Sequence, residues 1–194
     1  MSTASRIKGH ITETAITMFA NRGYHGVSTR DIAAAAKVTE GSIFRLYKTK
    51  DGLFKEAIAA VLKQALDPAQ FLLMIYENER KQEMPALLIS AVLRWYESLN
   101  QSSARLLTQA YLLTEWRDEA YGPVEKIIDI LANHLGGIER PKSTKQTDAK
   151  IAARGSILAL LQFKITYASS CSAKEETAAV TAILQQWLRG GRSA

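Results

Sequence analysis

The sequence contains little cysteine, no long uncharged run and no local metal-binding motif. Cys171 is the single cysteine among 194 residues, which excludes an intrachain disulfide framework and any site built from several cysteines. The longest stretch without a charged residue, 177–188, is twelve residues long, whereas a membrane-spanning helix needs about 20. We therefore expect no membrane partner and a reducing compartment.

Two further classes of protein find no support in the sequence. The three histidines, His10, His25 and His134, lack the H-E-x-x-H spacing of a zinc site. The N-terminal segment MSTASRIKGHITETA has polar residues where a secretory signal needs a continuous apolar stretch. We expect a cytoplasmic protein with no metal and no cofactor.

The pattern of apolar residues predicts an all-α fold. Hydrophobic residues make up 47% of the chain, enough for a substantial core. They recur at helical spacing almost throughout, and no segment alternates apolar and polar residues long enough to predict a strand.

Positive charge is concentrated in the N-terminal quarter. Residues 1–50 hold eight Lys and Arg against three acids, a net charge of +5 out of the chain's +6. The other 144 residues hold 17 basic against 16 acidic side chains. A compact positive region favours a polyanionic partner, because Lys and Arg displace the counterions of phosphates, although a solvated charged face would show the same pattern.

Two short helices are predicted inside this basic region. The first helix of the chain is expected to end near Asn21, before Gly23. Ser28 or Thr29 can cap a helix over 30–36, and Thr39 can cap another over 40–47.

The remaining helices are bounded by prolines and polar segments. A helix opening at Lys50 and Asp51 is expected to reach about residue 66. Prolines 68, 85 and 123 stand where helices commonly begin. The predicted ranges are 68–79, 84–99, 102–118, 123–136, 148–170 and 174–189, with a surface loop over 138–147.

Two short helices joined by a tight turn, the second flanked by cations, are typical of a helix-turn-helix. In that motif the second helix enters the major groove of double-stranded DNA, while caps and lysines hold phosphates. Val38 and Ile43 would face the core, and the opposite face of helix 40–47 would face DNA.

The stretch NRGYHGVSTRDIAAAAKVTEGSIFRLYKTKDGLF resembles the N-terminal DNA-binding domain of the TetR family of bacterial transcriptional regulators. The likeness covers about residues 6–62. It rests on the combined pattern of Gly23, Gly26, Thr29-x-x-Ile32-Ala33, Val38-Thr39, Gly41, Phe44, Lys50 and Leu53.

The resemblance implies a domain division and a mode of regulation. Residues 1–50 would form the DNA-binding domain, 51–66 a connecting helix and 67–194 a helical ligand-binding and dimerisation domain. A homodimer would bind a palindromic operator as a repressor and be released by a small-molecule effector.

The resemblance also assigns roles to single residues. Thr29 corresponds to a cap that bonds phosphate, and Arg45 is the strongest base reader by chemistry, because a guanidinium pairs with guanine through two hydrogen bonds. Lys48 and Lys50 are expected at phosphates. The predicted DNA-binding residues are Ser28, Thr29, Arg30, Thr39, Glu40, Gly41, Ser42, Phe44, Arg45, Lys48 and Lys50.

Three positions depart from the family pattern. Phe44 replaces the usual tyrosine, so a phenolic bond to phosphate is absent. Leu46 replaces the common tyrosine or histidine and offers only apolar contact. Lys37 replaces the usual turn glycine and is strained if that turn requires a positive φ.

The C-terminal part resembles nothing specific. Aromatic residues at helical spacing predict either a packed core or an apolar effector pocket, with Trp95, Tyr111, Trp116, Phe163 and Tyr167 as the pocket candidates. The apolar faces of the last two helices could close the core of a monomer or pack against their copies in a symmetric dimer. The predicted interface residues are Ile157, Leu161, Val180, Ile183, Leu184 and Trp187.

Two alternative functions remain open from the sequence. An effector-free DNA-organising protein of the same fold would bind many sites and have a fully packed C-terminal domain. A helical enzyme would need catalytic residues that meet only in space, because no local catalytic motif is present, and we expect no enzyme.

Overall fold

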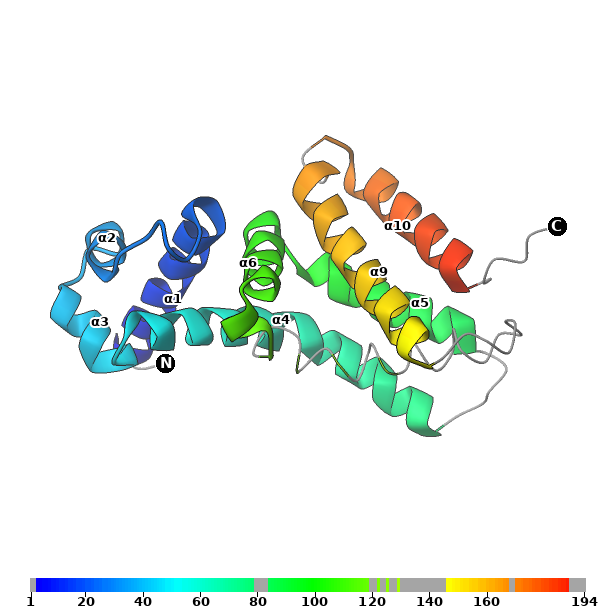
Figure 1. Ribbon diagram of the computed structural model, residues 1–194, viewed down its shortest axis with the longest axis horizontal. Helices are drawn as coiled ribbons and strands as arrows, with labels where there is room; N and C mark the ends of the chain where they lie inside the picture. Colours follow the sequence, from blue (N-terminus) through cyan, green and yellow to red (C-terminus); the bar gives the residue numbers. More distant parts are fainter. Residues whose placement is uncertain are drawn as a thin grey trace. The chain divides into compact units, whose positions relative to one another are not determined.

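The computed structural model divides the chain into two compact units (Figure 1). Unit 1 is Met1–Gln64 with Asn100–Gly122, and unit 2 is Ala65–Leu99 with Pro123–Ala194. The structure describes the backbone of residues 3–78, 84–118, 122, 125, 129, 146–167 and 170–188, and side chains within 3–65, 89–118, 122, 125, 129, 151, 153–167 and 170–185. All elements in these ranges are helical, with no strand among them, which confirms the all-α prediction.

Unit 1 begins with the long helix α1, Thr3–Arg22. Its apolar stripe is buried, and Ile11, Ala15 and Phe19 have no exposed surface. Gly23 follows in the left-handed region, at φ 76°, and donates its N–H to the Phe19 carbonyl over 2.8 Å. Glycine adopts this conformation without strain, so the predicted helix end at Gly23 is confirmed.

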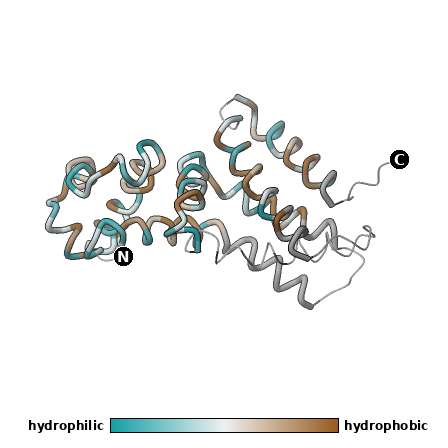
Figure 2. The backbone as a smooth tube through the Cα atoms, viewed as in Figure 1, coloured by the Kyte–Doolittle hydropathy of each residue, from teal (hydrophilic) through white to brown (hydrophobic). Residues whose placement is uncertain are grey.

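The next two helices, α2 (Thr29–Ala35) and α3 (Glu40–Tyr47), match the predicted helix pair to within a residue. Ile32 and Ile43 are fully buried and hold them to the core of unit 1. In Figure 2 hydrophobic and hydrophilic segments alternate along these helices, as expected when one face of each packs inward. Each such buried side chain contributes about 1.5–3 kcal/mol.

Helix α4, Lys50–Asn78, is one continuous helix of 29 residues. The prediction of a separate helix starting at Pro68 is therefore wrong. A proline inside a helix removes one N–H···O=C bond, yet the turns on either side keep theirs, so a long helix can continue through it. Leu53 and Phe54, in the first turns of α4, are fully buried in unit 1.

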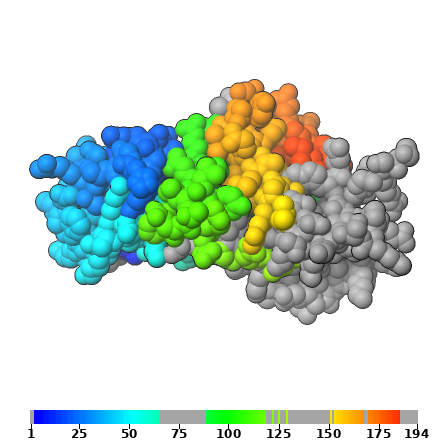
Figure 3. Space-filling view, viewed as in Figure 1, coloured from blue at the N-terminus to red at the C-terminus, as the bar shows by residue number. Residues whose placement is uncertain are grey.

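Helix α6 (Gln101–Leu112) and the 3₁₀ turn η1 (Thr114–Trp116) complete unit 1. The sequence prediction assigned these residues to the C-terminal domain, whereas α6 packs against α1. Gln109 donates to the Ala20 carbonyl over 3.1 Å, and Arg105 donates to the Asn21 side chain over 3.2 Å. Figure 3 shows α6 as a green surface directly beside α1 in blue.

Unit 2 contains α5 (Met84–Ser98), α9 (Gln146–Tyr167) and α10 (Ala173–Leu188). Helix α5 packs against both α9 and α10. These three ranges confirm the predicted helices 84–99, 148–170 and 174–189 within a few residues. The predicted helix 123–136 and most of the predicted loop 138–147 lie outside the described residues.

A buried hydrogen-bonded cluster joins α5, α9 and α10 in unit 2. The Tyr96 hydroxyl donates to Glu176 Oε1 over 2.6 Å, and Lys164 Nζ donates to the same oxygen over 2.9 Å. Burial alone would raise the pKa of Glu176, but hydrogen bonds from Tyr96 and Lys164 outweigh it and lower that pKa. Glu176 therefore stays ionised opposite the Lys164 ammonium.

A second polar contact anchors the C-terminal end of α3 to α1. The buried Tyr47 hydroxyl donates to the Lys8 carbonyl over 2.8 Å and lies 3.0 Å from Thr12 Oγ1. Burial raises the pKa of Tyr47, so its hydroxyl keeps the proton that it donates.

Removing the Tyr47 hydroxyl should loosen the attachment of α3. We expect Tyr47→Phe to lower the free energy of unfolding, measured by urea titration, by about 0.5–1.5 kcal/mol, the usual net worth of a neutral hydrogen bond. Tyr167→Phe, at a residue that is 53% exposed, is the matched control and should change stability by less than about 0.5 kcal/mol. Equal effects of the two substitutions would contradict the anchoring role.

Glu176→Gln should destabilise unit 2 by about 3–5 kcal/mol, because it leaves Lys164 buried without its counter-charge. In the unchanged protein the pKa of Glu176 is lower in the folded than in the unfolded state. Its contribution is therefore complete above the unfolded pKa of about 4.3 and is lost as pH falls through the lower folded value. The measurement is a series of urea titrations between about pH 3 and 7, which covers that window. The free energy of unfolding should fall less steeply with decreasing pH for Glu176→Gln than for the unchanged protein.

A double substitution separates the charge from the packing. Replacing both partners, Lys164→Met with Glu176→Leu, removes the buried charges together and should restore most of the lost stability. If the double variant were as unstable as Glu176→Gln, an uncompensated charge would not be the cause.

Candidate nucleic-acid interface

Helix α2 begins with a capping box. The Ser28 hydroxyl accepts from the Asp31 N–H, and the Asp31 carboxylate accepts from the Ser28 N–H over 3.0 Å. The Ser28 hydroxyl also donates to the Asp31 carboxylate, over 2.7 Å, and the two bonds that this carboxylate accepts from Ser28 lower the pKa of Asp31. Of the two caps predicted for this helix, Ser28 is the residue used, and Thr29 becomes the first helical residue.

Helix α3 begins at the predicted cap, Thr39. Its Oγ1 accepts from the Ser42 N–H over 3.2 Å. Ile43 and Tyr47 hold the inner face of the helix in the core. The outer face presents exposed residues that belong to the predicted DNA-binding set, namely Thr39, Gly41, Phe44 and Arg45, with Lys48 just beyond the helix.

The turn between the two helices places Lys37 at φ 54°. Lys37 donates to the Ala34 carbonyl and Val38 to the Ala33 carbonyl, which is the Schellman pattern that usually has glycine at this position. The condition under which strain was predicted at Lys37, a positive φ in this turn, is therefore met. A non-glycine residue in the left-handed region costs about 1–2 kcal/mol, which the surrounding packing has to offset.

A second strained residue, Lys48, lies between α3 and α4. Its φ of 68° and ψ of −47° combine with a 2.8 Å hydrogen bond from the Thr49 N–H to the Tyr47 carbonyl, which makes a γ-turn. Gly52 is required next to it, because a Cβ there would lie 2.1 Å from the Tyr47 carbonyl oxygen. The tight turn fixes where the Lys48 side chain leaves the backbone.

The start of α2 and the start of α3 are joined through side chains. Thr29 is only 8% exposed, and its hydroxyl donates to Glu40 Oε1 over 2.6 Å. Glu40 is half-buried at the first position of α3. Two residues predicted to contact DNA therefore contact each other.

Lys50 lies at the N-terminus of α4 against an aromatic ring. Its ammonium is 4.2 Å from the ring centroid of Tyr24, whose hydroxyl donates to Asp51. Burial and the Asp51 carboxylate raise the pKa of Tyr24, so the phenol stays neutral. The sequence reasoning gave no role to Tyr24; a tyrosine between the two glycines of the motif was the available signal.

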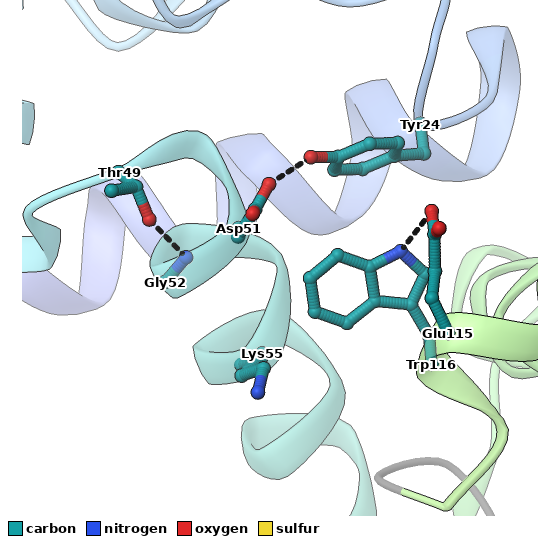
Figure 4. A pocket seen from close by; sticks show the side chains of 7 residues that line it. All are labelled: Tyr24, Thr49, Asp51, Gly52, Lys55, Glu115 and Trp116. Atoms are coloured by element: carbon teal, nitrogen blue, oxygen red, sulfur yellow. Dashed lines mark hydrogen bonds between the residues drawn. The ribbon is translucent and has the colours of Figure 1, made fainter.

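Tyr24 and Asp51 also line a cleft of about 490 Å³ in unit 1 (Figure 4). Trp116 forms one wall, and its indole N–H donates to Glu115 over 3.1 Å. The Trp116 ring lies 5.6 Å from that of Tyr24 and 5.3 Å from that of Phe54. Trp116 thus packs beside the start of α4.

The predicted effector-pocket residues are divided between the two units. Tyr111 and Trp116 belong to unit 1, whereas Trp95, Phe163 and Tyr167 belong to unit 2. In unit 2 the rings of Phe163 and Tyr167 are 5.1 Å apart. Trp95 is 1% exposed, and its indole N–H has no hydrogen-bond acceptor within the described part of the chain.

The predicted dimer-interface residues lie mainly inside unit 2. Ile157, Leu161, Val180 and Leu184 are at most 2% exposed within a single chain. Ile183 is half-buried, and the side chain of Trp187 lies outside the described residues. Exposed positions on the same helices include small residues, namely Gly155 and Ala159 on α9 and Ala178 and Ala182 on α10.

The described residues lack two other kinds of feature. In the part of the chain that is described, no helix combines the length and the apolar character needed to cross a membrane. The same residues contain no group of three or more His, Cys, Asp or Glu placed to hold a metal ion.

Comparisons with known proteins agree on one family. Residues 11–57 match the model of the bacterial regulatory proteins of the tetR family. No curated protein sequence matches the chain significantly.

Solved structures of similar fold cover nearly the whole chain. A regulator from Bordetella parapertussis 12822 is 17% identical with a TM-score of 0.75, over 97% of each chain. A TetR-like regulator from Rhodococcus sp. RHA1 is 18% identical with a TM-score of 0.72, over 98% of this chain and 99% of that one. FadR from Bacillus subtilis, solved with stearoyl-CoA, is 16% identical with a TM-score of 0.70, over 94% and 98%.

At these identities the solved structures establish the fold, and the match over residues 11–57 adds the helix-turn-helix sequence pattern. The fold similarity and the sequence match agree with the helix-turn-helix geometry of α2 and α3. Residues 11–57 therefore carry the sequence pattern of the tetR-family bacterial regulatory proteins, in a chain that has the fold of solved TetR-family transcriptional regulators.

Proposed function

We propose that this chain is a repressor that binds a palindromic operator as a homodimer and is released by a small-molecule effector. The observation that carries the proposal is the outward face of α3. Arg45 and Phe44 are exposed on it, while Ile43 and Tyr47 fix the helix from behind. A helix presented in this way fits the major groove of DNA.

The cations divide into two roles. Arg45 reads a base edge, because its guanidinium can donate two hydrogen bonds to guanine. Arg30, Lys48 and Lys50 contact phosphates, which fix the position of α3 in the groove without reading sequence. Support comes from the exposure of Arg30 and Lys48, from the fixed backbone at Lys48, and from the place of Lys50 at the first position of α4.

Residues 67–194 act as the effector and dimerisation domain in this proposal, with 1–50 as the DNA-binding domain and 51–66 as the connecting helix. Trp95 offers a buried indole N–H without an acceptor in the described chain, and an effector carbonyl or carboxylate would satisfy it. The stearoyl-CoA complex of the B. subtilis protein supports a ligand-binding role for this fold.

Release requires coupling between effector and DNA. A difference of about 1–3 kcal/mol between two conformations weakens operator binding about 5–150-fold. Helix α6 packs on α1 within unit 1, so a shift of α6 would act directly on the DNA-binding helices. Such a regulator works in the bacterial cytoplasm, without turnover of its ligand.

Arg45→Ala should relax sequence preference, because the bidentate contact that discriminates bases is lost. Lys50→Ala should weaken binding to all duplexes and reduce the slope of log affinity against log salt by about 1. Both effects can be measured by fluorescence anisotropy with selected and random duplexes.

Lys63→Ala is the matched control for the cations. Lys63 is exposed on α4, thirteen residues and about 20 Å beyond Lys50, and should leave both properties unchanged. Equal losses on selected and random DNA for Arg45→Ala and Lys50→Ala would contradict the division of roles. A random pool that yields no enriched motif would instead indicate a DNA-organising protein.

Ala182→Arg should shift the chain from dimer to monomer in sedimentation. Ala182 is an exposed small residue on α10, where close approach of a second copy would leave no room for a long cation. Ala59→Arg, at an exposed alanine of α4, is the control and should leave the dimer intact. A fully dimeric Ala182→Arg protein would place the interface elsewhere.

A further inference from the structure

We propose that Glu40 reads the exocyclic N4 amine of a cytosine in the major groove. Thr29 is the positioning residue that orients the Glu40 carboxylate. The inference rests on the proposed operator binding and specifies one base contact within it. It gives Thr29 a role different from the phosphate contact expected from sequence.

The geometry begins with the buried Thr29 side chain. Its hydroxyl donates to Glu40 Oε1 over 2.6 Å, a short bond to a carboxylate. Glu40 is the first residue of α3, directly after the Thr39 cap. The bond therefore fixes a long, flexible side chain at the end of α3 that enters the groove first.

The same bond argues against a phosphate contact by the Thr29 hydroxyl. A hydroxyl has one hydrogen to donate, and here it is donated to Glu40. Phosphate oxygens only accept, so Thr29 could bond a phosphate only by releasing Glu40. Thr29 therefore contributes to DNA recognition through Glu40.

Glu40 retains the capacity to accept from a base. An ionised carboxylate has about four lone-pair sites, of which Thr29 uses one. Within the described residues, no lysine or arginine forms a salt bridge with it. Close to DNA phosphates, a carboxylate that has no partner cation is repelled by their negative charge. This repulsion is unfavourable unless a hydrogen-bond donor on a base compensates it.

The major-groove edges of the bases then decide the choice. Guanine and thymine present acceptors, which repel a carboxylate. Adenine presents its N6 amine beside the acceptor N7, whereas cytosine presents its N4 amine with no neighbouring acceptor on its own edge. Glu40 should therefore select cytosine and disfavour guanine and thymine most strongly.

The test is selection of bound duplexes from a random DNA pool, with full-length protein and sequencing of the bound fraction. The unchanged protein should prefer cytosine at one position of each half-site by about 5–150-fold over guanine and thymine. Glu40→Gln should move that position toward adenine, because an amide pairs with adenine N6 and N7.

Variants of Thr29 test positioning separately from contact. Thr29→Val keeps the shape but removes the donor, and it should reduce the cytosine preference at that same position and at no other. Thr29→Ser retains a hydroxyl and should restore the preference. Glu13→Gln, at an exposed acid of α1, is the control for the loss of one negative charge.

Two results would overturn the inference in distinguishable ways. If the unchanged protein enriches a palindrome and Glu40→Gln selects the same bases at every position, Glu40 reads no base and the proposed function stands. If the unchanged protein enriches no motif, site-specific operator binding fails, and the cytosine contact fails with it.

Discussion

The attachment of α3 to α1 is the constraint on which the rest of unit 1 depends. Ile43 supplies apolar burial, and the Tyr47 hydroxyl bonds the Lys8 carbonyl beside Thr12. An eight-residue helix has too few internal hydrogen bonds to persist alone, so its position must come from tertiary contacts. With the inner face fixed from both ends, the outer face, and Arg45 on it, can enter a groove without a large further loss of entropy.

The backbone is strained at the residues that follow α2 and α3, and the packed core of unit 1 has to offset this strain as well. Lys37 and Lys48 both adopt positive φ, at 54° and 68°. Each costs free energy that the packed core must offset, and each places a cation where the chain changes direction. The close approach of Gly52 to the Tyr47 carbonyl shows how little space the second turn leaves. Backbone strain and positive charge therefore occur together in the short stretch that the family pattern covers.

Local chemistry made much of this predictable from the sequence. The signals for the helix ends are local: they are the caps Ser28 and Thr39 and the glycine that ends α1. The bounds of α2 and α3 could therefore be predicted to within a residue. Contacts between distant residues were not predictable. The Thr29–Glu40 bond depends on how α2 crosses α3, and the Lys50–Tyr24 contact depends on how α1 meets α4. Pro68 failed as a boundary because its local signal cannot show whether a helix continues through it.

Unit 2 shows a further limit of pattern reasoning. An apolar stripe shows that a helix face avoids water, but not whether its own chain or a second copy covers it. Leu161, Val180 and Leu184 are covered within the chain, around the ionised Glu176 and Lys164. A dimer built on α9 and α10 must therefore use the opposite faces, where Ala159 and Ala182 permit close approach. The buried cluster and the proposed interface would then lie back to back on the same two helices, so that each depends on the helices keeping one orientation.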